Sequence, residues 1–203
     1  MIATMPISKN ISQEQRVSDQ IKMLQAISCT VDAKSAIYIS GPITTGKNFI
    51  EWQLLQGRSL VFDEKVYQST LRAKVIKKNE KAILELAKKT RQLDNSQVIE
   101  PASLFIPEWS QLEYIDFWMK IIDLFVKEVV LVEGWQYSIG CAKEYNFAKK
   151  LGLKIRRHDG EVLEPQQGLD LMEKAVDEVE QLGRTDVVLQ FLATGLQQAA
   201  LEK

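Results

Sequence analysis

Glu144 is the residue whose neighbours in the sequence most suggest chemistry. It lies in the stretch GWQYSIGCAKEYNFA (134–148), where Ser138, Gly140 and Glu144 follow an apolar run. Ser138 is placed to cap the start of a helix, and Gly140 leaves room for a ligand at its first turn. The helix carries small or apolar side chains around Glu144: Cys141 three residues before it, Tyr145 next to it and Ala148 four residues after it. A carboxylate on such a face points partly inward, which is unusual unless it is paired or functional. A surface Glu at the edge of an amphipathic helix is the plainer alternative.

A second stretch, AIYISGPITTGKN (36–48), has the spacing of a phosphate-binding loop. Its Gly41-to-Lys47 segment reads G-x-x-x-x-G-K, as in ATP- and GTP-hydrolysing proteins, but Asn48 replaces the Ser or Thr that would hold Mg²⁺. Asn48 and Glu51 together resemble a capping box, so we expect Asn48 to be the helix N-cap and Lys47 to lie outside the helix. This argues against a metal-bound nucleoside triphosphate.

The same loop can still bind a phosphate without a metal. A strand, a Gly-containing turn and a helix N-terminus present free N–H groups, and Thr44, Thr45 and Lys47 add side-chain donors. An ordinary strand-to-helix turn, in which Gly41 and Gly46 only permit tight backbone geometry, is the alternative.

Strand-like and helix-like segments alternate along the chain, which predicts a parallel sheet covered by helices. Buried strands are expected at 35–40, 97–101, 128–134 and 153–157. Helices are expected at 12–28, 49–57, 63–93, 110–127 and 139–151, with two more after Pro165 that separate near Gly183. The helix at 49–57 is expected to end at Gly57. The 63–93 segment is expected to form one helix, or two with a break at Asn79. A capping box at Ser110–Glu113 marks the start of the helix expected at 110–127.

We therefore predict an α/β, Rossmann-like fold with helical N- and C-terminal extensions. The extensions are residues 1–32 and 159–203, the α/β domain is 33–158, and 57–95 is a helical insertion. If strands 35–40 and 128–133 are neighbours, both loops open at the carboxyl ends of the strands, where α/β sheets bind ligands.

Composition excludes several classes of function. The 203 residues carry a formal net charge of −1, which gives no reason to expect a nucleic acid as partner. Cys29 and Cys141 are too few for a disulfide framework or a zinc cluster, and His158 is the single histidine. The chain has no apolar run long enough for a bilayer and no signal peptide at its start, so we expect a cytoplasmic protein with no membrane partner.

With both motifs in place, the sequence resembles a known family. YISGPITTG followed by VEGWQYSIGCAKEYNFAKKLG is similar to the nucleoside 2-deoxyribosyltransferase superfamily, and most to its 2′-deoxynucleoside 5′-phosphate N-hydrolase-like branch. The resemblance covers residues 36–47 and 98–155. It implies that Glu144 is a nucleophile that attacks the anomeric carbon of a sugar, giving a glycosyl-enzyme that water or a second base resolves.

The resemblance also implies a substrate pocket. Its residues would be Tyr38, Ser40, Gly41, Pro42, Ile43, Thr44, Thr45, Gly46, Lys47, Gly134, Trp135, Ser138 and Gly140. In the monophosphate-cleaving branch, the positions of Ser138 and Gly140 hold the phosphate. Trp135 either stacks on a nucleobase or is buried between a strand and a helix. Arg156 and Arg157 either meet phosphate at the end of their strand or are ordinary solvated arginines.

The catalytic acid is where the sequence departs from the family. The family has an Asp 24–26 residues before the nucleophile, where this chain has Trp118 and Lys120. Asp116 lies about one helical turn earlier and is the candidate for that role. The alternative is a solvated face on which Asp116 pairs with Lys120 and Asp123 pairs with Lys127.

The predicted function is cleavage or transfer at the N-glycosidic bond of a nucleotide or nucleoside, with no metal and no cofactor. A catalytically inactive nucleotide sensor is the alternative, a related cleaver of NAD or a signalling nucleotide is a third hypothesis, and an NTPase of the phosphate-loop type is less favoured. The resemblance implies a homo-oligomer, a dimer or larger. The base, the sugar and the choice between hydrolysis and transfer stay open.

Overall fold

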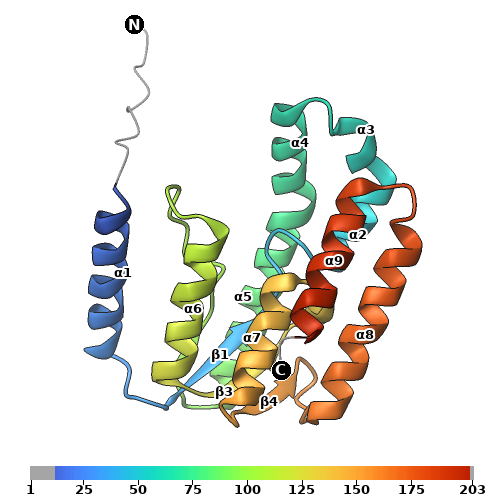
Figure 1. Cartoon of the computed structure of the whole chain (residues 1–203). Helices are drawn as coiled ribbons and strands as arrows, with labels where there is room; N and C mark the ends of the chain where they lie inside the picture. The colour runs from blue at the N-terminus through green and yellow to red at the C-terminus, as the bar shows by residue number, and fades with distance from the viewer. Residues whose placement is uncertain (1–11, 202–203) are drawn as a thin grey trace, which may run out of the picture.

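Four parallel strands form one sheet in the order β2-β1-β3-β4 in the computed structural model, which describes residues 12–201 (Figure 1). The strands are β1 (Ala36–Ser40), β2 (Val98–Ile99), β3 (Val126–Leu131) and β4 (Lys154–Arg157). The predicted α/β, Rossmann-like architecture is confirmed. The two motif strands are neighbours, since Tyr38 faces Val129 and Ser40 faces Leu131 in the register of β1 and β3. This meets the condition under which both loops open at the same edge of the sheet. Residues 1–11 of the predicted N-terminal extension lie outside the described part.

Helices cover both faces of the sheet (Figure 1). The longer helices are α1 (Gln13–Ser28), α5 (Lys77–Leu93), α6 (Gln111–Phe125), α7 (Ile139–Lys150), α8 (Pro165–Leu182) and α9 (Val187–Leu201). On one face, Ile37, Ile39 and Val130 pack against Ile83 and Ala87 of α5. On the other face, the strand residues that alternate with these, such as Tyr38, pack against α6 and α7 in a core that includes Phe117 and Tyr145. Because strand side chains alternate, consecutive residues of β1 serve opposite faces.

The helix after the glycine-rich loop differs from its prediction at both ends. Helix α2 (Lys47–Trp52) has Gly46 as its N-cap, so Lys47 is the first helical residue and Asn48 is not the cap. The Asn48 amide instead donates to the Asn79 side chain at 2.7 Å, and this tertiary bond replaces the predicted local one.

Gly57 does not close that helix either. The chain continues through a π-helical turn, η1 (Gln53–Gly57), into α3 (Arg58–Leu60). A Cβ on Gly57 would lie 2.2 Å from Oε1 of Gln53. Gly57 therefore leaves room for the buried Gln53 side chain inside a helix, and its chain-breaking tendency is overridden.

The 64–93 segment is one helical run without a break at Asn79. It comprises α4 (Glu64–Leu71), the π-helical turn η2 (Arg72–Ile76) and α5, with Asp63 capping its start. The irregularity is the π turn, which precedes Asn79. Buried Asn79 donates through Nδ2 to the carbonyls of Ile43 and Thr45, both at 2.9 Å, and so ties this helix to the glycine-rich loop.

The remaining predictions for the second half are largely confirmed. Ser110 and Glu113 form the capping box of α6, which ends at Phe125 and passes directly into β3 at Val126, two residues earlier than the predicted strand start. The two C-terminal helices separate near Gly183 as predicted, and α9 packs against α7 and α8. Between residues 12 and 201, no helix combines the length and apolar character that crossing a membrane requires.

Candidate active site

The Glu144 carboxylate is held by two hydroxyl groups from the neighbouring strand. The Tyr38 hydroxyl donates to Oε1 at 2.8 Å and the Ser40 hydroxyl donates to Oε2 at 2.6 Å. Tyr38 and Ser40 are two apart in β1, so both point to the α7 face of the sheet. Glu144 reaches them from the second turn of α7, which Ser138 caps as predicted. The predicted inward orientation of Glu144 is confirmed, since the residue is only 9% exposed.

Burial is the largest influence on the protonation of this carboxyl group. Loss of water raises the pKa of Glu144 to about 7, and the hydrogen bonds from Ser40 and Tyr38 only partly offset that rise. The same burial holds the Tyr38 pKa well above its usual value, so Tyr38 stays a proton-bearing donor. Burial and the nearby Glu144 raise the pKa of Cys141 to about 12, which keeps that thiol protonated and unreactive. Glu144 is therefore the group in this cluster that changes its charge near neutral pH.

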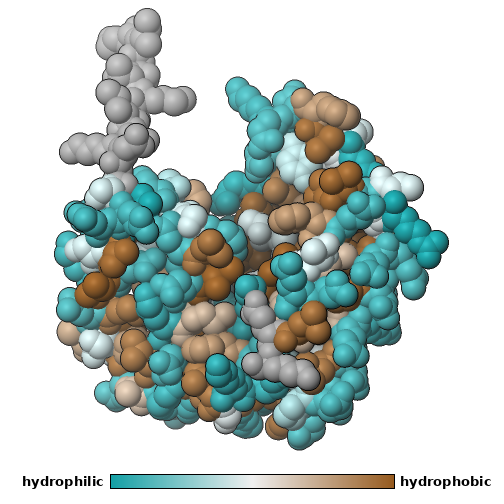
Figure 2. Space-filling view, in the orientation of Figure 1, coloured by the Kyte–Doolittle hydropathy of each residue, from teal (hydrophilic) through white to brown (hydrophobic). Residues whose placement is uncertain are grey.

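Glu144 lies on the wall of a cavity of about 460 Å³, large enough for a nucleoside-sized ligand. Both motifs line the cavity, through Gly41, Ile43, Thr44, Thr45, Ser138 and Gly140, and the two threonines and Ser138 supply hydroxyl groups. A largely apolar part of the lining comes from the segment after β2 and from α6: Leu104, Phe105, Ile106, Trp109, Ile115 and Trp118. Figure 2 shows a hollow between the surface over α6 and that over α4 and α9, with hydrophobic side chains along its edge. A carboxylate, several hydrogen-bonding groups and large apolar side chains thus line one cavity.

Several predicted pocket residues do not line this cavity. Tyr38 and Ser40 contact the Glu144 carboxylate and not the cavity. Pro42 and Gly46 are buried in the loop itself. The Gly46 backbone has φ +91°, and its N–H donates to the Tyr137 carbonyl at 3.2 Å. These residues shape the loop and join it to the second motif.

Lys47, Gly134 and Trp135 also lie away from the cavity lining. Lys47 is exposed in the first turn of α2, and Gly134 turns the chain with φ +77°. Trp135 is buried, with its ring 4.8 Å from that of Tyr145. Of the two interpretations of Trp135, the structure shows the buried one.

Asp116 lies outside the cavity, on the solvent side of α6. Its carboxylate is exposed and pairs with Lys120 at 2.6 Å. The predicted second pair is wrong, because Asp123 lies 3.9 Å from Lys34 and Lys127 bonds Ser96. The face of α6 that does reach the cavity carries Gln111, Tyr114, Ile115 and Trp118. The structure therefore does not bring Asp116 together with Glu144.

Two charged residues that sequence reasoning passed over do line the cavity. Arg72 and Glu80 come from the predicted insertion, eight residues apart on the same helical run, with Ile76 between them. Their periodicity of four was visible in the sequence. Nothing local, however, distinguished them from the other charged residues of that segment. Phe191 from α9 also lines the cavity, so the C-terminal helix contributes to the site.

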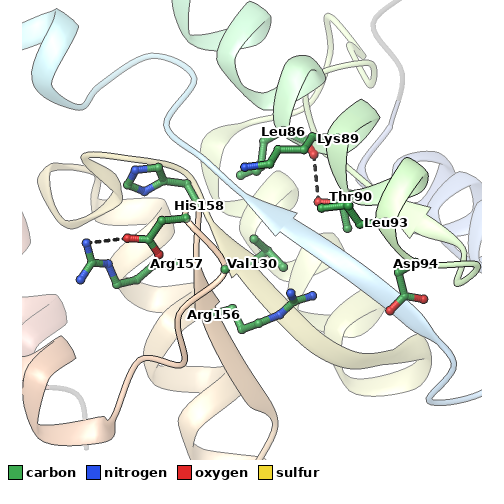
Figure 3. A pocket seen from close by; sticks show the side chains of 11 residues that line it. Leu86, Lys89, Thr90, Leu93, Asp94, Val130, Arg156, Arg157 and His158 are labelled. Atoms are coloured by element: carbon green, nitrogen blue, oxygen red, sulfur yellow. Dashed lines mark hydrogen bonds and ion pairs between the residues drawn. The ribbon is translucent and has the colours of Figure 1, made fainter.

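Arg156, Arg157 and His158 belong to a different recess, of about 100 Å³, shown in Figure 3. Val130 and Leu86 line it, which places it on the α5 face of the sheet, opposite the side that carries Glu144. Arg156 pairs with Glu128, and Arg157 lies 2.8 Å from Asp159. Their positive charges are thus already matched by carboxylates, and they do not reach the cavity.

The described residues contain no group of three or more His, Cys, Asp or Glu side chains that could hold a metal ion. Comparison with protein families finds a match in the middle part of the chain. Residues 64–157 match the family model described as a domain of unknown function (DUF4406). The match covers a little under half of the chain and includes Arg72, Glu80 and Glu144, but leaves out the glycine-rich loop. Searches of curated proteins and of solved structures gave no match.

Proposed function

We propose that this protein cleaves the N-glycosidic bond of a nucleoside or nucleotide, with Glu144 as the nucleophile. The proposal rests on the Glu144 carboxylate. It is buried, accepts hydrogen bonds from two hydroxyl groups and lies on the wall of a nucleoside-sized cavity at the carboxyl ends of β1 and β3. The resemblance of both motifs to the nucleoside 2-deoxyribosyltransferase superfamily supports the same chemistry.

The reaction proceeds in two displacements. An oxygen of Glu144 bonds to C1′ of the sugar as the C1′–N bond to the base breaks, and the electron pair and a proton from solvent go to the base. Water then attacks C1′, the bond to Glu144 breaks and the carboxylate is restored as water gives up its proton. A second base in place of water would make the reaction a transfer. Tyr38 and Ser40 hold the carboxylate in position in both steps, and the hydroxyls of Thr44, Thr45 and Ser138 are available to the sugar or its phosphate.

A nucleotide-sensing protein without catalysis is the second candidate. One observation favours it: the α6 face toward the cavity carries Trp118 where the related enzymes have an acid, and Asp116 is on the solvent side. A missing proton donor would slow departure of the base by roughly 10²–10⁴. The sensor would bind nucleoside or nucleotide and leave it intact. An enzyme that cleaves NAD or a signalling nucleotide would use the same carboxylate.

Triphosphate hydrolysis is supported less well. Lys47 does start a helix, as in the phosphate loops of such enzymes, but it is absent from the cavity lining. Asn48 has no hydroxyl for Mg²⁺, and its amide is engaged by Asn79. Mg²⁺-dependent ATP or GTP turnover that Lys47→Ala abolishes would establish this function instead.

A homo-oligomer remains part of the proposal. Phe105 and Phe191 line the cavity yet are 74% and 77% exposed, and Leu112 nearby on α6 is 74% exposed. Large apolar side chains at a cavity mouth are suited to contact with a second copy. Light scattering coupled to size exclusion measures the oligomeric state directly.

The test of the proposed function is release of free base. The protein is incubated without added metal with ribo- and deoxyribonucleosides, their 5′-monophosphates and NAD, and the products are separated by chromatography. Glu144→Gln is the test variant. Asp116→Asn is the matched control, because it makes the same carboxyl-to-amide change outside the cavity.

We expect base release by the wild-type protein and by Asp116→Asn, and none by Glu144→Gln. Binding without release by any form would favour the sensor. Release that survives in Glu144→Gln would refute the assigned nucleophile.

A further inference from the structure

Within the described chain, three charged residues line the cavity: Glu144, Arg72 and Glu80. Their nearest charged atoms, Arg72 Nη1 and Glu80 Oε1, are 3.6 Å apart, too far for a hydrogen bond of good geometry. Both groups therefore retain hydrogen-bonding capacity. They form an adjacent donor and acceptor on the wall that the 64–93 helical run provides.

The helix that carries this pair is fixed on its other sides. Val75 and Ile83 are fully buried on its core side. Asn79, one residue before Glu80, is bonded to the loop carbonyls of Ile43 and Thr45. The π turn η2 begins at Arg72 itself, and π turns inside helices re-aim side chains and occur often at functional sites. The pair is thus presented from a rigid element.

We propose that Arg72 and Glu80 form a base-recognition subsite and that guanine is the base they select. This inference rests on the proposed function, because it takes the bound molecule to be a nucleoside or nucleotide. The apolar wall formed by residues such as Trp118 and Phe105 would contact the faces of the ring. The ion pair would bind its hydrogen-bonding edge through a guanidinium donor beside a carboxylate acceptor.

The donor and acceptor pattern of the pair distinguishes guanine from the other bases. The Glu80 side chain is 24% exposed and that of Arg72 is 55% exposed, so Glu80 has less access to water. The Glu80 carboxylate can accept two hydrogen bonds side by side, and the Arg72 guanidinium can donate one next to them. Guanine offers two adjacent N–H donors, N1–H and N2–H, with the O6 acceptor beside them. Adenine and cytosine offer the carboxylate only an amino group, and uracil only a ring N–H.

Binding of the hydrogen-bonding edge of guanine also offers a substitute for the proton donor that the cavity face of α6 lacks. Negative charge that develops on a departing guanine spreads to O6, where an N–H of Arg72 would donate. Such stabilisation of the leaving group favours cleavage without a proton donor on α6.

The test compares guanosine, inosine, adenosine and cytidine, as ribo- and 2′-deoxynucleosides, by kcat/KM for base release. Equilibrium binding to Glu144→Gln is measured in parallel by calorimetry with the same compounds. Glu80→Gln and Arg72→Gln are the test variants, each made in both backgrounds. Glu85→Gln is the matched control, since Glu85 is an exposed carboxylate on the same helix that is absent from the cavity lining.

We expect guanosine to be preferred over adenosine and cytidine by about tenfold to a hundredfold, with inosine between them because it lacks the N2 amino group. Glu80→Gln should remove the preference, and Glu85→Gln should retain it. If no base is released but Glu144→Gln binds guanosine preferentially through Glu80, the proposed catalysis fails and the subsite stands. Equal binding of all four bases, preference for another base or an unchanged preference in Glu80→Gln would overturn the subsite.

Discussion

Replacing Glu144 by Gln should abolish base release and remove a loss of stability that the wild-type protein undergoes as the pH rises from 4.5 to 7. Burial raises the Glu144 pKa from 4.5 to about 7, so the folded protein holds a proton on this carboxyl that the unfolded chain has lost. Below pH 4.5 the group is protonated in both states and costs nothing. As the pH rises from 4.5 to 7, unfolding releases a proton and the folded state loses stability, and above pH 7 the penalty is constant.

The size of the penalty follows from the two pKa values. A difference of about 2.5 pKa units corresponds to about 3 kcal/mol at 1.36 kcal/mol per unit. The substituted glutamine carries no charge, so the variant escapes this pH-dependent penalty. For a chain of this length, 3 kcal/mol corresponds to about 6–12 °C in Tm. The amide can accept from only one of the two hydroxyls, which lowers stability at every pH and does not alter the pH dependence.

Urea unfolding of wild type and Glu144→Gln between pH 4.5 and 8.5 measures this effect. The free energy of unfolding of the variant should rise relative to wild type by about 3 kcal/mol across that range, with most of the change between pH 5 and 7. The other titrating groups are common to both proteins and cancel in the difference. A difference between the two proteins that does not change with pH would refute the assignment of a raised pKa to a buried Glu144.

Two further predictions concern the residues that position the site. Ser40→Ala removes a hydrogen bond that lowers the Glu144 pKa, so the rising limb of the kcat/KM profile should move to higher pH. Base release should then fall about tenfold more at pH 6.5 than at pH 9, and an unshifted profile would show that Ser40 does not act through Glu144. Asn79→Ala removes the donor to two loop carbonyls and the acceptor for Asn48, and should lower the free energy of unfolding by about 2–3 kcal/mol with a rise in KM. Loss of stability without any change in KM would mean that the loop keeps its shape without this clamp.

The sequence by itself determined the order of strands and helices and the inward position of Glu144. These features follow from local signals: apolar runs of strand length, the capping serines Ser110 and Ser138, and helical spacing around Glu144. Each signal lies within about one helical turn or one strand and is therefore readable without the rest of the fold.

Tertiary structure alone decided which residues share the cavity with Glu144. Asn48 left its predicted capping role because Asn79, 31 residues away, supplied a hydrogen-bonding partner. The α6 face that meets the cavity carries Trp118, and Asp116 lies in solvent. The rotation of α6 about its own axis, to within about one residue position, decides which side chains face the cavity. Arg72 and Glu80 join the site through the packing of a distant helix, and no local pattern encodes a contact between segments so far apart in the chain.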